Sequence, residues 1–210
     1  MPGEGKSLAA TNLAIIFAQN NERTLLVDAD LRHPVQHKVF GTTSECGLSK
    51  FLTDSMSLDE VIQKTEIPHL DIITVGHRPS NPPELLGSSR MRELLENVRQ
   101  RYDRIVFDCP PVNAVSDPLI LLPHVEGVIF ILRFNKLRSV IVARTLKKLR
   151  DSGVPVVGGV MNNIDLKHGG YYYYYYHYPY SKYYSKYYQQ SKQEQAEENR
   201  RPSKATGSKS

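Results

Sequence analysis

The chain has no run of 18 apolar residues, which is about the length that a membrane-spanning helix requires. It also shows no secretory signal, because Met1 is followed at once by PGEGKS. Its two cysteines, Cys46 and Cys109, do not suggest a disulfide framework or a metal site. The lack of a membrane span, a secretory signal and a disulfide framework predicts a protein of the reducing cytoplasm. A length of 210 residues allows one domain with a full core and a tail.

Most of the chain also lacks an excess of positive charge. The net charge is +5, but residues 181–210 hold seven Lys or Arg and three Glu, which is a net charge of +4. Residues 1–180 therefore carry only about +1. This balance excludes a basic nucleic-acid platform in the globular part, so we expect no nucleic-acid partner. The charges of the tail are diluted by Gln and Ser, which favours a solvated segment over a lipid-binding one.

Apolar runs alternate with helical patterns over the first 165 residues. Five runs read as strands and lie at 24–28, 70–75, 104–107, 127–132 and 154–161. Helices are expected at 7–19, at 57–64 behind a Ser57–Glu60 capping box, at 81–100 with an interruption at Gly87, and at 139–149. The strands are continuously apolar, which predicts an α/β fold with a mostly parallel sheet and helices on both faces.

The strongest chemical signal lies at the start, where Gly3-Glu4-Gly5-Lys6-Ser7 leads into a helix. This is the second half of a phosphate-binding loop, in which glycines let backbone N–H groups turn toward phosphate oxygens. The helix N-terminus adds favourable partial charge. In such loops the lysine reaches the β- and γ-phosphates and the serine hydroxyl ligates Mg²⁺.

Two strand ends carry carboxylates. Asp28 and Asp30 follow the run LLV, and Asp108 ends the run IVF, which is the Walker B position near Mg²⁺. In an open α/β sheet the crevice beyond the carboxyl ends of the strands binds ligands. A solvated turn is the alternative for the Asp-Ala-Asp segment. Cys109 is interpreted as a small side chain that fills space rather than as a nucleophile. Arg133, near a strand end, could reach a phosphate, but we expect it to face solvent.

A tyrosine cluster lies near the C-terminus, where residues 171–188 hold 12 of the 13 tyrosines. A packed core does not need such a cluster. It is either a sticky low-complexity tract or a set of phosphate acceptors. The acceptors would be Tyr171, Tyr172, Tyr173, Tyr174, Tyr175, Tyr176, Tyr178, Tyr180, Tyr183, Tyr184, Tyr187 and Tyr188. We predict a domain over residues 1–166 and a mostly disordered tail over 167–210.

The segments PGEGKS, LLVDADLRHP and IVFDCPP together resemble the bacterial tyrosine kinases of polysaccharide export. Three further segments support the resemblance: Gly47-Leu48-Ser49, the run NPPELL from Asn81, and Gly159-Val160-Met161-Asn162. The resemblance covers about residues 1–165. It implies a P-loop NTPase-like fold in which the strand before the phosphate loop, and the first half of the loop, are missing from this chain.

The resemblance also implies roles for single residues. Gly3, Glu4, Gly5, Lys6, Ser7 and Leu8 would hold the phosphates of ATP, with Lys6 counted as catalytic, and Asn162 would contact adenine. Ser7, Asp30 and Asp108 would hold Mg²⁺. Asp28 would polarise the incoming tyrosine hydroxyl, whose ordinary pKa is near 10. An exchange of roles between Asp28 and Asp30 remains open.

The implied function is an ATP-dependent protein tyrosine kinase that phosphorylates its own tyrosine cluster in trans and regulates exopolysaccharide or capsule synthesis and export. The implied partners are other copies in a ring, and a membrane-embedded chain-length or export protein or a missing N-terminal membrane region. Such a kinase acts at the inner face of the cell membrane. A ParA/MinD-like switch ATPase and a non-catalytic interaction protein are the alternatives.

Overall fold

The computed structural model describes residues 3–53 and 55–164. The predicted tail, with its twelve tyrosines, lies outside the described residues. Among the residues described, no helix is both long and apolar enough to cross a membrane.

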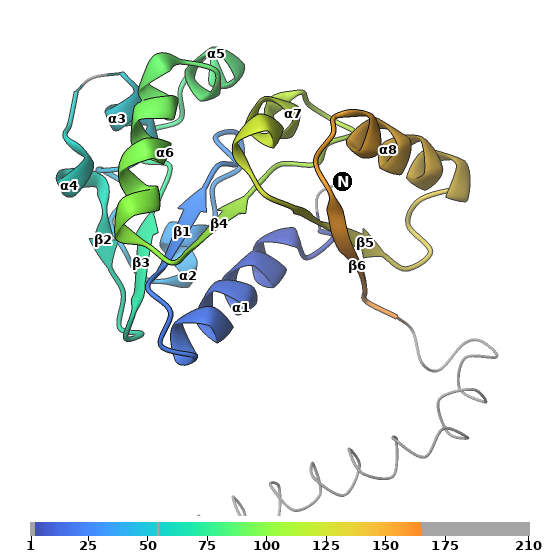
Figure 1. The fold of residues 1–210 in the computed structure, drawn as a ribbon, viewed down its shortest axis with the longest axis horizontal. Coiled ribbons are helices and arrows are strands. Elements are labelled where there is room, and N and C mark those ends of the chain that lie inside the picture. Colours follow the sequence, from blue (N-terminus) through green and yellow to red (C-terminus); the bar gives the residue numbers. More distant parts are fainter. Residues whose placement is uncertain (1–2, 54, 165–210) are drawn as a thin grey trace, which may run out of the picture. The chain divides into compact units, whose positions relative to one another are not determined.

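Four strands form the larger sheet, in the order β2-β3-β1-β4 (Figure 1). They are β1 (Thr24–Asp28), β2 (Gln63–Lys64), β3 (Leu70–Ile73) and β4 (Arg104–Asp108). The central strand β1 is parallel to β3 and to β4, as the continuous apolar runs predict. Its register pairs Asp28 with Asp108, so two carboxylates meet at one edge of the sheet.

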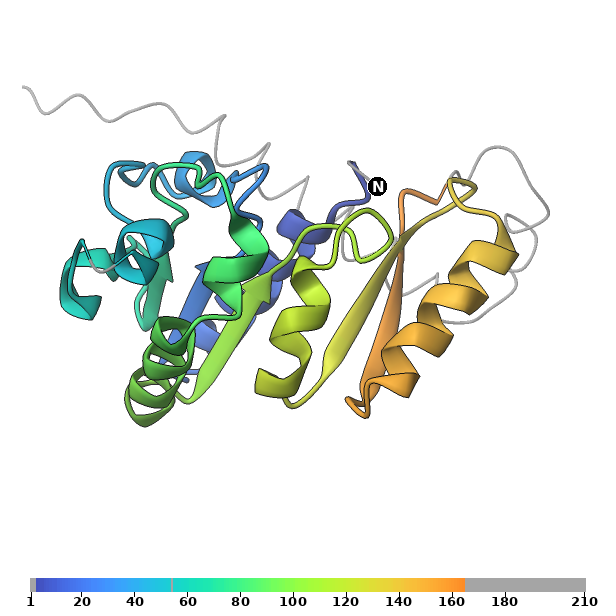
Figure 2. The same cartoon turned by 90° about the horizontal axis from the view of Figure 1, so that it is seen from above.

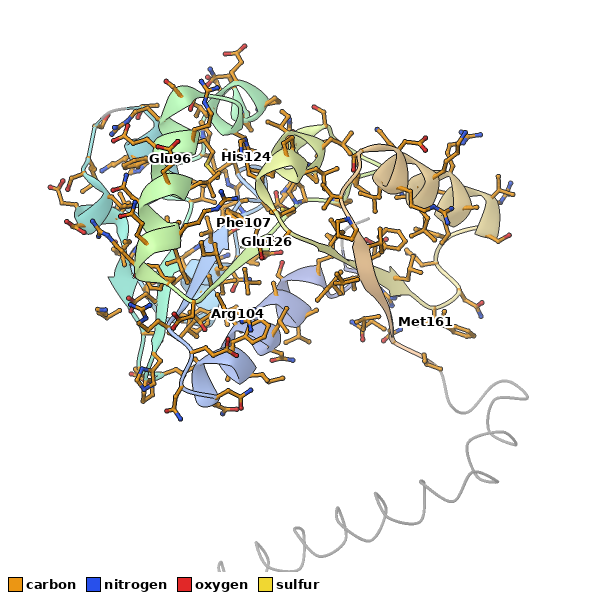
Figure 3. The ribbon with its side chains drawn as sticks, in the orientation of Figure 1. Glu96, Arg104, Phe107, His124, Glu126 and Met161 are labelled. Atoms are coloured by element: carbon orange, nitrogen blue, oxygen red, sulfur yellow. The ribbon has the colours of Figure 1, made fainter. Side chains whose placement is uncertain are left out.

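A second sheet pairs β5 (Val128–Arg133) with β6 (Val156–Asn162), again in parallel. Figure 3 places Phe107 on β4 and Met161 on β6. The expectation of five strands in one sheet therefore needs correction, since the described residues form six strands in two sheets. The additional strand is β2, which pairs antiparallel to β3. It replaces the end of the helix expected over 57–64, because Ile62 is already extended and closes that helix.

The helices mostly follow the predicted segments. Gly87 divides the predicted helix into two, and the Ser88 hydroxyl caps the second by accepting a hydrogen bond from the backbone N–H of Met91 at 3.2 Å. The helices are α1 (Lys6–Gln19), α2 (Gln36–Val39), α3 (Leu48–Leu52), α4 (Leu58–Val61), α5 (Pro82–Leu86), α6 (Ser89–Arg101), α7 (Asp117–Leu121), the 3-10 helix η1 (Leu122–His124) and α8 (Ser139–Asp151).

Alternate residues of β1 are buried in different cores, which confirms helices on both faces of the larger sheet. Leu25 and Val27 belong to the core that residues of α3 to α6 complete. Leu26 lies on the opposite face, in a core with Ala14 and Ala18 of α1. Figure 2 shows the same arrangement from above, with α1 and α6 on opposite sides of the strands. Burying β1 on both faces fixes the strand whose end carries Asp28.

Candidate active site

The predicted phosphate loop lies at the N-terminus of α1. Gly3 and Gly5 both have positive φ, 79° and 84°, and Gly5 is the residue that precedes the helix. No side chain caps α1, and its first turn contains no acidic residue. An uncapped helix N-terminus leaves backbone N–H groups and positive partial charge available to an anion such as a phosphate.

Residues from the second sheet hold this loop. Arg133, the last residue of β5, donates from Nη1 to the carbonyl oxygen of Gly3 at 3.2 Å. Asn162, the last residue of β6, donates from Nδ2 to the carbonyl oxygen of Glu4 at 3.1 Å. Arg133, which was expected to face solvent, thus also contacts the phosphate loop. The role of Asn162 at adenine stays a prediction, and its amide lies against the loop.

Lys6 begins α1, and its Nζ lies 3.3 Å from the carboxylate oxygen Oε2 of Glu4. Glu4 is 5% exposed, so the lysine compensates a buried negative charge. Leu8 is 61% exposed on α1. Its predicted contribution to phosphate binding is therefore limited to its backbone, because its side chain extends into solvent.

Asp28 is completely buried, and both of its oxygens accept hydrogen bonds from the backbone. Oδ1 accepts from the N–H of Asp30 at 3.3 Å, and Oδ2 accepts from the N–H groups of Val35 and Gln36, each at 3.1 Å. Burial, with a smaller contribution from the charge of Asp108, raises the pKa of Asp28 to about 7. Asp28 thus anchors the segment 29–36, whatever its role toward a tyrosine hydroxyl.

Asp30 and Asp108 lie near the phosphate loop. Asp30 accepts hydrogen bonds at Oδ1 from the backbone N–H groups of Arg32 and His33, at 3.2 and 2.9 Å. Burial raises the pKa of Asp108, and hydrogen bonds from Gln36 and from the Ser7 side chain oppose this shift. The charges of Asp30 and Lys6 also act on Asp108, so the structure brings the predicted metal ligands and the lysine into one region.

The donor set fits a divalent cation that also binds phosphate. In the part of the chain that the structure describes, no group of three His, Cys, Asp or Glu residues makes a closed metal centre. Mg²⁺ does not need one, because it keeps several water ligands and binds through one or two carboxylates plus phosphates. Asp28 and Asp108 are both buried, and burial raises the pKa of each, so a nearby positive charge would stabilise their ionised forms.

Two interactions of the site were missed in the sequence. The guanidinium of Arg32 binds Asp117 in a bidentate ion pair, with Nε–Oδ2 at 2.8 Å and Nη2–Oδ1 at 3.0 Å. The side chain of Asp117 is completely buried at the start of α7. The amide of Gln36 donates to Asp108 at 2.8 Å. Arg32 lies inside the motif LLVDADLRHP, but neither Asp117 nor Gln36 stands out by residue type or spacing.

Comparison with known proteins agrees with this geometry. A family model described as AAA domain matches residues 2–130. Tyrosine-protein kinase YwqD of Bacillus subtilis is 38% identical over 174 residues, which are 82% of this chain and 73% of that protein. Tyrosine-protein kinase ptk of Acinetobacter johnsonii is 39% identical over 170 residues, which are 81% of this chain. The chain spans only 23% of the length of ptk.

Solved structures give the same result. The VpsO kinase domain is 41% identical and superposes with a TM-score of 0.74, over 79% of this chain and 81% of that domain. MinD of Pyrococcus horikoshii, solved with Mg-ADP, superposes with a TM-score of 0.63 at 19% identity and therefore shares the fold alone.

A helix that begins at a glycine-rich loop, next to aspartates at the ends of two paired parallel strands, defines a nucleotide-binding protein of the P-loop NTPase class. Within that class, the identity to YwqD over nearly three quarters of its length decides the family. The chain belongs to the bacterial tyrosine-protein kinases.

Proposed function

We propose that the chain is an ATP-dependent protein tyrosine kinase that transfers the γ-phosphoryl group to tyrosines of the cluster at 171–188. The observation that carries this proposal is the meeting of an uncapped helix N-terminus, Lys6 and Ser7 with the buried carboxylate of Asp108. Such a site combines donors for phosphate oxygens with ligands for a cation, which are the two requirements of phosphoryl transfer.

The residues have distinct tasks in this reaction. Lys6 and the N–H groups of the loop bind the phosphates of ATP, and Ser7, Asp30 and Asp108 would hold Mg²⁺. The bound cation would neutralise negative charge on the phosphates. Asp28 carries a raised pKa near 7, which is in the range of a group that accepts a proton from a tyrosine hydroxyl. Its burial and its backbone partners make the anchoring of segment 29–36 the competing role.

The acceptors are the twelve clustered tyrosines, which lie outside the described residues. A segment of 18 residues that presents twelve hydroxyls suits transfer in trans, from the site of one copy to the tail of another, within an oligomer that could be a ring. Each phosphate adds roughly −1.5 to −2 charges, so two or three would cancel the tail charge of +4.

The biological setting follows from the resemblance described above. The kinase would act at the cytoplasmic face of the membrane with a membrane-embedded chain-length or export partner, and would regulate exopolysaccharide or capsule synthesis. The fold that the chain shares with MinD supports one alternative, a switch ATPase without kinase activity. A tyrosine cluster is unnecessary for a switch ATPase, and this favours the kinase.

The test is to incubate the 210-residue chain with Mg-ATP and map phosphate by mass spectrometry. We expect phosphotyrosine between residues 171 and 188 in the parent, and its loss in Lys6→Met and in Asp30→Asn. Lys147→Met, which removes a lysine from α8, is the matched control and should keep the parental level. Unchanged phosphotyrosine in Lys6→Met would refute the site, and ATP hydrolysis without phosphotyrosine would support the switch ATPase.

A further inference from the structure

Gln36 is a fully buried amide at the first position of α2. A buried primary amide destabilises a fold unless its donors and acceptor are paired. Its Nε2 donates to Oδ2 of Asp108 at 2.8 Å and to the carbonyl oxygen of Ser7 at 3.2 Å. Its Oε1 accepts from Oγ1 of Thr11 at 2.9 Å. One side chain therefore connects the end of β4 with the first turns of α1.

The chemistry of the neighbours decides the orientation of this amide. An ionised carboxylate only accepts hydrogen bonds, so the NH₂ group must face Asp108. The reversed amide would place two acceptor oxygens 2.8 Å apart. The Thr11 hydroxyl lies 2.9 Å from the carbonyl oxygens of both Gln36 and Ser7, and it shares its one proton between them. The backbone N–H of Gln36 adds a contact to Asp28.

These contacts restrict the carboxylate of Asp108. The torsion that turns a carboxylate plane is broad and soft, so burial alone does not fix it. Here the Gln36 amide of α2 donates both to the carboxylate of Asp108 and to the backbone carbonyl of Ser7 in α1, so it ties the carboxylate to the start of that helix. A neutral amide fixes one oxygen without neutralising the carboxylate, which therefore stays able to bind a cation.

We propose that Gln36 is a positioning residue that holds the carboxylate of Asp108 beside Ser7, so that a divalent cation meets two ligands already in place. The residue acts through Asp108 and contacts no reacting atom. The inference deepens the proposed function and rests on it for the identity of the cation as the one that accompanies ATP.

The experiment measures Mn²⁺ binding to the full chain without nucleotide, by electron paramagnetic resonance. In Gln36→Met, which keeps length but removes the amide, we expect the Kd for Mn²⁺ to rise about tenfold, as is usual when a group that orients a metal ligand is lost. The matched control is Gln63→Met. The Gln63 amide also joins segments by hydrogen bonds, to the Cys46 carbonyl and the Thr74 hydroxyl, but touches no site carboxylate. It should bind Mn²⁺ as the parent does.

Several outcomes would overturn the inference: a parental Kd in Gln36→Met, an equal loss of affinity in Gln63→Met, or no Mn²⁺ binding by the parent. Gln36→Asn is a second variant in case Gln36→Met misfolds, because it keeps a polar amide at this position. The shorter side chain withdraws that amide from Asp108, so we expect a similar loss of affinity for Mn²⁺. If both Gln36 variants unfold, Gln36 is a structural residue and the inference also fails.

Autophosphorylation measured in parallel distinguishes a failure of the inference about Gln36 from a failure of the proposed kinase function. Mn²⁺ binding that depends on Gln36, in a parent that incorporates no phosphate, would refute the proposed function and leave the inference standing. A parent that autophosphorylates, with Mn²⁺ affinity unchanged in Gln36→Met, would refute the inference alone.

Discussion

Gly5 joins the phosphate loop to α1 in a conformation that other residues avoid, with φ at 84°. The position also has little space for a side chain, because a Cβ on residue 5 would lie 2.0 Å from Nδ2 of Asn162. The loop therefore depends on glycine for two separate reasons, backbone conformation and the close approach of the amide that holds Glu4.

A substitution pair separates these reasons. Gly41 also has positive φ, 62°, but a Cβ added there would meet no atom within 4 Å beyond its chain neighbours. We expect Gly41→Ala to lower the free energy of unfolding by about 1–2 kcal/mol through the left-handed backbone alone. Gly5→Ala should cost clearly more in chemical denaturation, and adding Asn162→Ala should return its cost to that of Gly41→Ala. Equal costs for the two single variants would show that the contact with Asn162 is unimportant.

The raised pKa of Asp28 predicts how stability varies with pH. The pKa lies near 3.8 in the unfolded chain and near 7 in the folded one, so between these values the folded state binds the proton more tightly. Its stabilising contribution is complete below pH 4 and is lost as pH rises through 7, with a slope of at most about 1.4 kcal/mol per pH unit. Without metal, the free energy of unfolding should fall over this window, and less so in Asp28→Asn. Identical slopes in the two proteins would contradict the assignment.

At the scale of elements, the ion pair between Arg32 and Asp117 joins the loop after β1 to the start of α7. Asp117 is completely buried, so removing its partner leaves a buried negative charge. We expect Arg32→Ala to lower the free energy of unfolding by about 3 kcal/mol in urea denaturation. Arg101→Ala, which breaks an exposed pair with Asp59, is the control and should cost less than about 1 kcal/mol. Similar costs would mean that the pair does not connect the two elements.

Local patterns were sufficient for most of these elements. The apolar runs predicted β1, β3, β4, β5 and β6. Continuous burial explains the apolar runs of β1 and β3, whereas most residues of β6 are exposed. The strand β2 has two residues and no such run, so its pairing with β3 could not be predicted. The same limit applies to α2 and α7, whose four and five residues are too short for a periodic pattern.

The contacts that complete the site are long-range, and this explains why they were missed. Gln36 meets Asp108 across 72 residues, and Arg133 meets Gly3 across 130. The motif residues Lys6, Ser7, Asp30 and Asp108 could be chosen as candidates because their chemistry shows in short segments, and their roles stay predictions. Their supporting partners, such as Gln36 and Arg133, have no local sequence pattern. They can be identified only from the three-dimensional structure.

At the scale of the whole molecule, the sheet is divided between β4 and β5. Within the described ranges β4 pairs only with β1, and β5 only with β6. The strand β6 extends apolar side chains into solvent, with Val157 67% and Met161 51% exposed. Such a surface favours association.

Transfer of phosphate between two chains tests the proposed kinase most directly. A Lys6→Met chain with an intact tyrosine cluster supplies acceptors but no active site, and a chain with all twelve clustered tyrosines changed to Phe supplies the site without acceptors. After the two are mixed with Mg-ATP, mass spectrometry should find phosphate on residues 171–188 of the Lys6→Met chain, and on neither chain incubated alone. If the mixture contains no phosphotyrosine while the parent chain also remains unmodified, the site is not that of a tyrosine kinase.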